Sequence, residues 1–349
     1  MKILYVYRTA RKEIFRNAKK HLEPDHSLYG ANHLQNLGFK IEFSDIAYSP
    51  LNLLHLFLLP LEKILVKTTS IGFKLDQAIL LLPKALSADV IIATTDSAGL
   101  PFLLMKKLGI LKTPLIYIST GLVNELQIRR KNFVFKLYQS SFKASEFVVC
   151  HSEVEKQLFQ KVVPEAKTRV NFVPFGIDNA YFQCHKKTNY FILSIGRDRS
   201  RDYKFLAKVS EKMSDEKFVV ITSKSNIRGI VFPENVQIYF DLPYKEVKKF
   251  YCRSKAVFLP LKELHRASGQ ISFLEALASN NKVVVSEVNG ILDYKSAFYD
   301  NVYLFDPGDL KGAIRILRKS IRAKRAPFKI NKFTSENYAN NLSKLIKSL

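Results

Sequence analysis

One polar stripe on an otherwise apolar helix is the first feature of this sequence that could do chemistry. Residues 269–281 read GQISFLEALASNN, and Ser272, Glu275 and Ser279 recur at spacings of three and four, which places them on one face of a largely buried helix that begins near Ser268 or Gly269. A buried carboxylate needs a polar partner, and a helix N-terminus offers backbone N–H groups to an anion. Together they would hold a ligand rich in hydroxyl and phosphate groups. The alternative is a structural ion pair between Glu275 and a nearby Lys or Arg.

Two sets of short apolar runs, alternating with helical patterns, must position these groups. The first set predicts strands at 2–7, 39–46, 89–95, 114–120, 147–152 and 170–176. A turn-rich basic segment follows, and the second set predicts strands at 191–196, 217–223, 236–240, 256–261, 282–287 and 302–305. Repeated strand and helix predict parallel sheets covered on both sides. We therefore expect an α/β chain of two doubly wound, Rossmann-like domains, with functional residues in the loops after the strands and a site in the cleft between domains.

The charge balance narrows the class of partner. The chain has 349 residues and a formal net charge of +24, and its densest basic run, from Lys311 to Lys332, contains no acidic residue. Such a surface attracts polyanions, whether phosphate-bearing ligands, anionic lipid head groups or nucleic acid. The alternative is that these lysines and arginines serve only solubility. The run holds Phe328 as its one aromatic residue, which makes nucleic acid an unlikely partner because single strands bind through stacking on interleaved aromatics.

Cysteine usage and hydropathy bear on location. Cys150, Cys184 and Cys252 are widely spaced and form no CxxC pair, which favours a reducing cytoplasm and argues against a zinc site. The apolar start of the chain is too short for a signal peptide, and no stretch predicts a membrane span. Residues 50–74 are leucine-rich and flanked by lysines, but Pro60 interrupts them. They predict either a buried core helix or a segment lying in a membrane interface.

Several motifs occur in an order that makes the chain similar to a known family. They are VPFGID (173–178), LSIGRDRSRDYKFL (193–206), the helix of residues 269–281 with the strand after it, and FDPGD (305–309). Together they resemble the GT-B glycosyltransferases, most closely glycosyltransferase family 4, over the second half well and over the first half in outline. The resemblance implies transfer of a sugar from a nucleotide-sugar, usually with retention at the anomeric carbon.

The resemblance also implies a domain arrangement. Residues 1–180 would form the acceptor-binding domain, and residues 181–332 the nucleotide-sugar-binding domain. Residues 333–349 predict a helix that starts near Ser335 and has Tyr338, Leu342, Leu345 and Ile346 on one face. The resemblance implies that this helix packs back onto the N-terminal domain.

Roles for individual donor-site residues follow from the resemblance. Glu275 matches the second Glu of the family's paired-Glu motif and would accept hydrogen bonds from the donor's ribose hydroxyls. Gly196 and Arg197 match the Gly-Arg pair whose cation neutralises the diphosphate as it leaves. A second phosphate-binding base would be Arg201 or Lys204. The alternative is that this segment is only a hydrated, charged loop. The donor-binding set is completed by Gly269, Gln270, Ile271 and Ser272.

Two departures from the family pattern affect the donor sugar and the catalytic base. The family's first Glu, eight residues before Glu275, is Ala267 here. Its contact with the donor sugar is therefore either absent or replaced by the backbone N–H groups of Gly269 and Gln270 and the Gln270 side-chain amide. The family's His in an N-domain loop is Thr120 here, which cannot act as a base at neutral pH. A retaining reaction needs no protein base. An inverting one would need a carboxylate, which is Asp96 or Glu125, although Asp96 can equally be a helix N-cap.

The first strand ends in a basic loop instead of the glycine-rich turn common in this fold. Arg8, Arg11 and Lys12 lie there and would bind the phosphate of a lipid-linked or phosphorylated glycan acceptor, or would simply be a solvated helix start. We expect a cytoplasmic hexosyltransferase of cell-surface polysaccharide biosynthesis, in peripheral contact with the inner face of an anionic membrane. It would need no metal and no cofactor besides its substrate, for example a UDP- or GDP-sugar. The competing hypothesis is a non-catalytic GT-B-like protein that binds nucleic acid or an anionic polymer.

Overall fold

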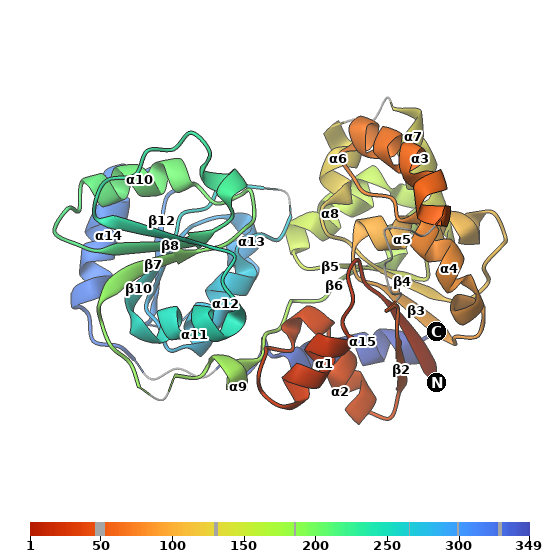
Figure 1. The fold of residues 1–349 in the computed structure, drawn as a ribbon, viewed down its shortest axis with the longest axis horizontal. Helices are drawn as coiled ribbons and strands as arrows, with labels where there is room; N and C mark the ends of the chain where they lie inside the picture. Colours follow the sequence, from red (N-terminus) through yellow and green to blue (C-terminus); the bar gives the residue numbers. More distant parts are fainter. Residues whose placement is uncertain (46–52, 129–131, 185, 265, 299, 327–329) are drawn as a thin grey trace. The chain divides into compact units, whose positions relative to one another are not determined.

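Two compact units make up the chain (Figure 1). The computed structural model describes residues 1–45, 53–128, 132–184, 186–264, 266–298, 300–326 and 330–349. Unit 1 comprises residues 1–19, 27–174 and 338–349, and unit 2 comprises residues 20–26 and 175–337. The sequence analysis placed the boundary after residue 180 and assigned residues 20–26 to the first domain. In the structure the main chain passes between units after Pro174, and that short segment packs with unit 2.

Unit 1 is built on a six-stranded parallel sheet of order β2-β1-β3-β4-β5-β6. Its strands are β1 (Lys2–Val6), β2 (Lys40–Phe43), β3 (Val90–Ala93), β4 (Leu115–Ile118), β5 (Phe147–Cys150) and β6 (Val170–Phe172). Each coincides with one of the predicted apolar runs, because strands of a parallel sheet are buried on both faces and read as continuous apolar sequence.

Successive side chains of these strands enter two different apolar cores. Leu4 and Ile91 point to one face and Ile3 and Ile92 to the other, as the period of two in a strand requires. Helices cover both faces. They are α1 (Lys12–Lys19), α2 (Ala31–Asn36), α3 (Leu53–Thr69), α4 (Leu75–Leu86), α5 (Asp96–Lys107), α6 (Leu122–Ile128), α7 (Phe133–Ser141), α8 (Glu153–Val162) and α15 (Ser335–Lys347), with short 3-10 turns η1 (His26–Leu28), η2 (Phe142–Ala144) and η3 (Pro164–Arg169).

The terminal helix α15 packs on the face that Ile3 and Ile92 share. Its residues Tyr338, Leu342 and Ile346 are buried in that core, and Leu345, the fourth residue of the predicted face, is partly buried against it. Ala339 lies against Gly30 so closely that a side chain at position 30 would clash with the α15 backbone. Residues 338–349 therefore belong to unit 1, although the preceding residues 175–337 belong to unit 2.

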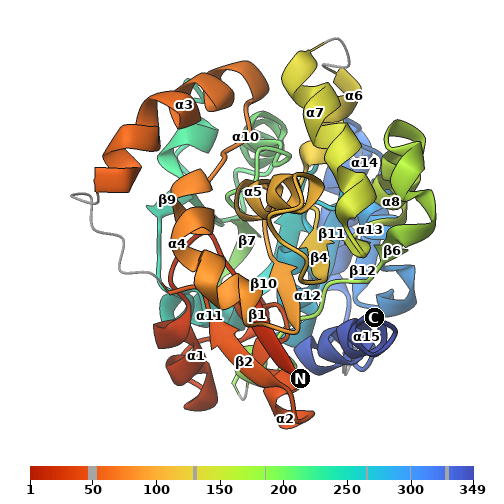
Figure 2. The ribbon, with the colours of Figure 1, turned by 90° about the vertical axis from the view of Figure 1, so that its right-hand side faces the viewer.

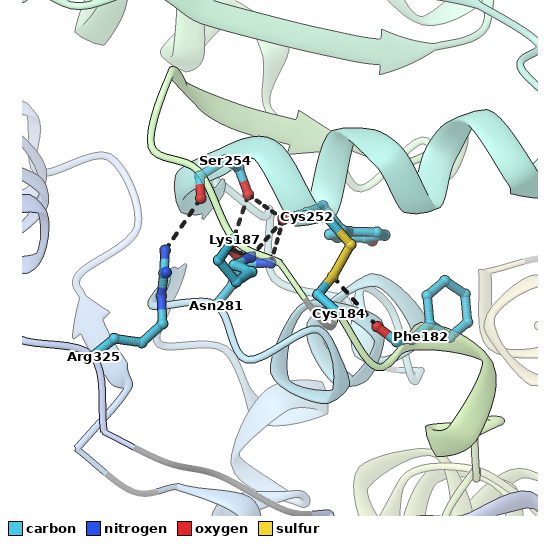
Figure 3. Close-up of a disulfide and its surroundings, with 8 residues drawn as sticks. Phe182, Cys184, Lys187, Cys252, Ser254, Asn281 and Arg325 are labelled. Carbon is cyan, nitrogen blue, oxygen red and sulfur yellow. Dashed lines mark hydrogen bonds between the residues drawn. A yellow bond between two sulfur atoms is a disulfide. The ribbon is translucent and has the colours of Figure 1, made fainter.

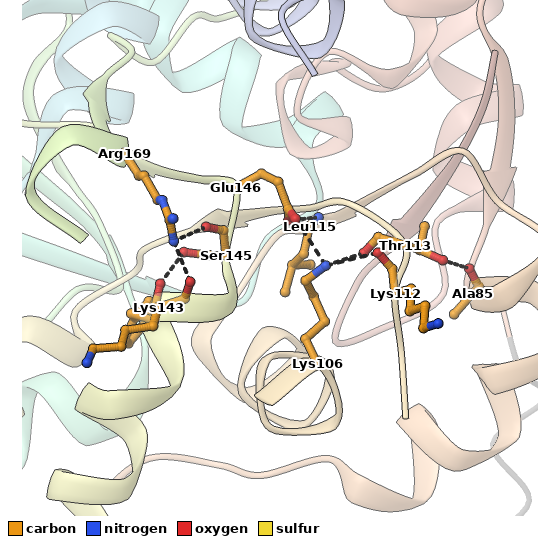
Figure 4. A network of polar contacts seen from close by, with 10 residues as sticks. Ala85, Lys106, Lys112, Thr113, Leu115, Lys143, Ser145, Glu146 and Arg169 are labelled. Carbon is orange, nitrogen blue, oxygen red and sulfur yellow. Dashed lines mark hydrogen bonds and ion pairs between the residues drawn. The ribbon is translucent and has the colours of Figure 1, made fainter. Parts of the chain in front are cut away.

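A polar network secures the amino ends of β4 and β5 (Figure 4). The Lys106 ammonium donates to the Thr113 carbonyl at 2.7 Å and pairs with Glu146 at 3.1 Å, and the other Glu146 oxygen accepts from the Leu115 amide at 2.6 Å. Arg169 donates to the Ser145 carbonyl at 3.1 Å. Both cations are bonded to backbone carbonyls or to Glu146, so we interpret this network as structural: it fixes the loops before β4 and β5.

Helix α3 lies at the periphery of unit 1, beside α4 (Figure 2). It continues through Pro60, which the sequence analysis expected to interrupt it. Two of its polar side chains attach it to α4 and to the residue before that helix: His55 Nδ1 lies 2.8 Å from Asp76 Oδ2, and Glu62 pairs with Lys74 at 2.8 Å. Its apolar side chains face solvent, with Leu53 82% and Phe57 81% exposed. The alternative of a buried core helix is therefore wrong.

Unit 2 repeats the architecture with a sheet of order β12-β11-β10-β7-β8-β9, again parallel throughout. Its strands are β7 (Phe191–Ile195), β8 (Phe218–Thr222), β9 (Val236–Phe240), β10 (Ser254–Leu259), β11 (Val283–Ser286) and β12 (Val302–Phe305). Its helices are α9 (Asn179–Phe182), α10 (Tyr203–Glu211), α11 (Tyr244–Arg253), α12 (Gln270–Ala278), α13 (Asn289–Leu292) and α14 (Leu310–Arg322), with 3-10 turns η4 (Lys224–Ile227) and η5 (Lys295–Ala297). The predicted fold of two doubly wound α/β domains is confirmed.

A disulfide links Cys184, just after α9, to Cys252 near the end of α11 (Figure 3). Nearby, the Lys187 ammonium donates to the Tyr251 carbonyl and to Asn281 Oδ1, both at 2.6 Å. Cys150 is a buried free thiol. Because disulfides persist in oxidising compartments, the cysteines no longer support the prediction of a reducing cytoplasm. In the described part of the chain, no helix is both long enough and apolar enough to cross a membrane.

Candidate functional site

A cavity of about 390 Å³ opens in unit 2 at the carboxyl end of its sheet. This is where ligands bind in open parallel sheets. The loop after β7, the start of α11 and the first turns of α12 form its walls. The lining residues that the argument uses are Gly196, Arg197, Arg201, Tyr244, Ala267, Gly269, Gln270, Ser272 and Glu275.

Arg201 is the buried cation of this cavity. Its side chain is only 6% exposed, and Nη2 donates to Ser272 Oγ at 2.9 Å. Nε and Nη1 have no hydrogen-bond partner among the described residues. A buried guanidinium with two unused donors is costly in the absence of a ligand. The arrangement therefore fits an anion that accepts from both nitrogens.

Two glycines make room for this guanidinium. Gly196, with φ of 149°, and Gly269, with φ of 84°, both adopt backbone conformations that disfavour side chains, and a Cβ on either would clash with Arg201. Gly269 is also the N-cap of α12, and no side chain caps that helix. Its first amides therefore point toward the same space as Arg201. The predicted start of this helix near Gly269 is confirmed.

Asp198 organises the opposite wall. It pairs with Arg266 at 2.7 Å and accepts from Ser268 Oγ at 3.0 Å and from the Ser200 amide at 2.8 Å. Burial opposes its ionisation, but the charge and hydrogen bond of Arg266 dominate and lower the pKa of Asp198 to about 2. Arg266 is thus neutralised by a permanent carboxylate, whereas Arg201 is not.

Arg197 and Lys204 lie in different surroundings from Arg201. The Arg197 side chain is 61% exposed at the rim and pairs with Asp241 at 3.2 Å. Lys204 is exposed on α10 and lines a separate hollow with Lys208 and Glu211. Among the predicted phosphate-binding bases, the structure therefore buries only Arg201 in the cavity.

Glu275 forms the floor of the cavity, at 3% exposure. Tyr251 Oη donates to its Oε2 at 2.8 Å, and His26 Nε2 lies 3.6 Å from its Oε1. Burial raises the pKa of Glu275 to about 8, although Tyr251 and the Arg201 charge oppose the shift. The carboxyl group is therefore mostly protonated at neutral pH while the cavity lacks a ligand.

His26 is a site residue that the sequence analysis missed. It belongs to the short segment, residues 20–26, that the N-terminal half contributes to unit 2. The motif DHSLYG around it carries no recognisable periodicity or spacing. Only the three-dimensional structure brings it to Glu275, 249 positions away.

In unit 1, Asp96 begins α5 at the carboxyl end of β3 and is buried. Its carboxylate accepts from Tyr117 Oη at 2.7 Å, from Thr120 Oγ1 at 2.8 Å and from the amides of Thr120 and Leu122 at 3.3 and 3.0 Å. Burial raises the pKa of Asp96, and these four bonds oppose the rise. Because a carboxylate has about four acceptor sites, this geometry fits a group that holds the loop after β4. Glu125, the other candidate base, is half-buried in the first turn of α6.

The basic loop after β1 is also in unit 1. Arg8 and Lys12 are exposed, and Arg11 is half-buried with its guanidinium carbon 5.8 Å from the centre of the Tyr7 ring. Asp45 accepts from the backbone amides of Arg11 and Lys12, both at 2.9 Å. Asp45 thus fixes the backbone of the loop, and these two bonds do not involve the cationic side chains.

Comparison with known proteins rests on structure. Neither a protein-family model nor a curated protein matches the sequence. Solved structures do: HepE from Anabaena in complex with UDP-glucose superposes with a TM-score of 0.67 and 12% identity over 100% of both chains. Sucrose-phosphate synthase from Thermosynechococcus elongatus gives 0.66 and 13%, over 100% of this chain and 94% of that one. The galactosyltransferase WaaB of the lipopolysaccharide outer core gives 0.57 and 13%, over 100% and 99%. This chain has the fold of these GT-B glycosyltransferases.

Proposed function

We propose that this protein is a glycosyltransferase that takes its sugar from a nucleotide-diphosphate sugar. The observation that carries the proposal is Arg201, a buried guanidinium with two unused donors, held between two glycines at the uncapped start of α12. A diphosphate supplies the acceptor oxygens and the negative charge that this arrangement lacks. One structural neighbour, HepE, was solved with UDP and with UDP-glucose, so UDP-sugars are the first donors to test.

The chemistry follows from where charge develops. When the glycosidic bond to the phosphate breaks, negative charge grows on the leaving nucleoside diphosphate. Arg201 and the α12 amides, already in place, would stabilise that charge more than they stabilise the ground state. Glu275, on the next turns of the same helix, would accept hydrogen bonds from the ribose hydroxyls and so orient the leaving group. We propose retention, in which a leaving-group oxygen takes the acceptor's proton and no protein base is required.

The acceptor proposal is separate and rests on unit 1. Arg8, Arg11 and Lys12 give the end of β1 a positive charge, which fits a phosphorylated or lipid-linked glycan. In this proposal Asp96 and Thr120 shape the neighbouring loop, because the Asp96 carboxylate is already engaged by Thr120 and Tyr117.

The exposed face of α3 supports contact with a membrane, where a lipid-linked acceptor would lie. Leu53, Phe57 and Ile64 are 82%, 81% and 60% exposed, while His55 and Glu62 attach the helix to Asp76 and Lys74 of unit 1. Lys63 and Lys67 are exposed on the same helix, so its charge complements anionic lipid head groups. We propose that α3 docks on an anionic membrane surface. The cytoplasmic side of that membrane remains a prediction.

A thermal-shift screen tests the donor proposal. Binding to the native state raises the melting temperature by mass action, so the protein is screened with UDP, GDP and ADP, their glucose conjugates and the free nucleosides. A shift with one nucleoside diphosphate and its sugar, followed by release of that nucleotide during turnover, supports the proposal. Stabilisation by polyphosphate and oligonucleotides alone, without base preference, would instead favour the non-catalytic polyanion binder.

A further inference from the structure

The imidazole of His26 is held in a fixed position beside Glu275 by three aromatic rings of unit 2. It stacks on Phe182 at 6.0 Å between centroids and meets the rings of Tyr244 and Phe175 edge-on at 5.4 and 6.2 Å. The side chain is 3% exposed. Nε2 lies 3.0 Å from Tyr244 Oη and 3.6 Å from Glu275 Oε1. One ring nitrogen therefore faces both a hydroxyl and the oxygen of Glu275 that Tyr251 does not bond.

Glu275 has to change its state when a ribose arrives. An ionised carboxylate only accepts hydrogen bonds, so it is the form better suited to two ribose hydroxyls that both donate. In the protonated form one of the two oxygens carries an O–H group that donates. The empty cavity favours the protonated form through burial. In the proposed function, donor binding therefore favours loss of a proton from a group that is almost fully buried.

We infer that His26 is a positioning residue that takes up the Glu275 proton when the nucleotide-sugar binds. The inference rests on the proposed function. The proton leaves the Glu275 carboxyl oxygen and bonds to Nε2 of His26, so a neutral pair becomes a carboxylate and an imidazolium, and no proton passes to solvent. The pair stays neutral overall, which limits the cost of ionising a buried carboxylate.

The groups around the pair are compatible with both states. Tyr244 Oη can donate to a neutral Nε2 and, after rotation of its hydroxyl, accept from a protonated one. The face of Phe182 favours the imidazolium. Tyr251 and Tyr181 also face Glu275, and burial keeps the pKa of both phenols high, so neither takes its proton. Arg201 supplies a constant positive charge on the remaining side.

The test is the pH dependence of donor affinity in a His26→Gln variant, measured by calorimetry with UDP-glucose or the conjugate that the screen selects. Such a conjugate carries the same phosphate charge from pH 6.5 to 8.5. Gln can hydrogen-bond but cannot take a proton, so in the variant Glu275 must lose its proton to solvent. With its pKa at about 8, the ionised fraction rises about 25-fold between these pH values. The variant should bind about 25-fold more weakly at pH 6.5 than at pH 8.5.

Wild-type affinity should change less than about threefold over the same range, because the proton stays within the pair. His21→Gln is the matched control: His21 is exposed in the same short segment, so this variant should follow the wild type. A variant His26→Gln that keeps the wild-type pH profile would overturn the inference, and so would a wild type with the 25-fold dependence. Absence of binding by any nucleotide-sugar to the wild type would instead overturn the proposed function.

A measurement on the unaltered protein covers a variant that fails to fold. Nitrogen-15 spectra of the imidazoles report protonation directly, and saturating UDP-glucose at pH 7.5 should convert one histidine from the neutral to the doubly protonated form. An analogue lacking both ribose hydroxyls should not. If no histidine changes state with the full donor, the inference is wrong.

Discussion

Replacement of Arg201 by methionine should remove most of the affinity for a nucleoside diphosphate while leaving the fold intact. Methionine fills a similar volume without charge. The guanidinium is 6% exposed, forms one hydrogen bond to Ser272 and pairs with no carboxylate among the described residues. A buried cation in that position destabilises the empty protein. The variant should therefore melt at a higher temperature than the wild type when no ligand is present.

The loss of affinity follows from the two unused nitrogens. Nε and Nη1 of Arg201 lack partners in the empty cavity, and each would form one charge-assisted hydrogen bond with a phosphate oxygen. Such bonds contribute about 1.5 to 3 kcal/mol each. Two of them correspond to a weakening of about 100- to 10,000-fold, and we expect the lower half of this range because the α12 amides remain.

Calorimetry with UDP and with uridine separates this effect from general damage. The Arg201→Met variant should lose affinity for UDP and keep its weak affinity for uridine. Arg197→Ala is the matched control, because Arg197 is 61% exposed and paired with Asp241, so its removal should change the UDP affinity by about 1 kcal/mol at most. Equal losses for UDP and uridine, or a larger loss in Arg197→Ala than in Arg201→Met, would refute the assignment of the diphosphate to Arg201.

Three further perturbations test other parts of the structure. Because the raised pKa of Glu275, about 8, means that the native state binds a proton that the unfolded state has lost, the contribution of this one group to stability should fall by up to about 1.4 kcal/mol per pH unit from pH 5 toward pH 8. Buried His151 and Lys187, whose pKa values are lowered to about 4 and about 6, act in the opposite direction, so the contribution is read as the difference between the wild type and a Glu275 variant. Denaturation curves of Glu275→Gln should lack this slope, and an unchanged slope would contradict the buried protonated carboxyl. Serine at Cys184 and Cys252, which are 68 residues apart, should lower the free energy of unfolding by about 2 to 4 kcal/mol; no loss would mean that the disulfide does not form in solution. Glutamate at Leu56 and Phe57 should abolish flotation with anionic vesicles, whereas Glu at the exposed Val231 should not, and flotation insensitive to salt and lipid charge would argue against docking by α3.

The fold could be predicted because its strands are fully buried. All twelve described strands coincide with apolar runs such as residues 191–196 and 236–240, and strand–helix alternation in a parallel sheet admits few topologies. Helix α12 was predictable for a related reason, since its apolar residues surround a single polar stripe.

Features that depend on tertiary contact left no such pattern. The course of α3 through Pro60 depends on attachment of its polar residues to α4, which composition does not reveal. Residues 20–26 pack with unit 2 although the strands on either side of them belong to unit 1. The disulfide joins cysteines of ordinary spacing, because α9 and α11 bring them together only in the folded chain.

The sequence was enough to predict that the motif of residues 197–202 belongs to the site, but not which of its side chains points into the cavity. Arginines alternate along RDRSRD (197–202), so the sequence could not say which one enters the cavity. The backbone at Gly196, the space beside Gly269 and the hydroxyl of Ser272 together select Arg201. The other two arginines of the motif, Arg197 and Arg199, are exposed, and Arg197 pairs with Asp241 at the rim.

Position 267 carries alanine instead of an acidic residue, which removes one hydrogen-bond acceptor that the hydroxyl groups of a donor sugar could use. Ala267 lines the cavity between Arg266 and Ser268, both of which are bonded to Asp198. The carboxylate on this wall is thus already used by protein groups. The polar groups that remain near Arg201 are the α12 amides, which only donate, and the Gln270 amide, which can do both. Glu275 is assigned to the ribose in the proposed function and Asp198 is bonded to protein groups, so among the described lining residues we expect Gln270 and the shape of the cavity to decide selectivity among hexoses. If Arg201 holds the diphosphate as proposed, Ala267→Glu should weaken the binding of UDP, because a carboxylate at position 267 would repel the diphosphate across the same cavity.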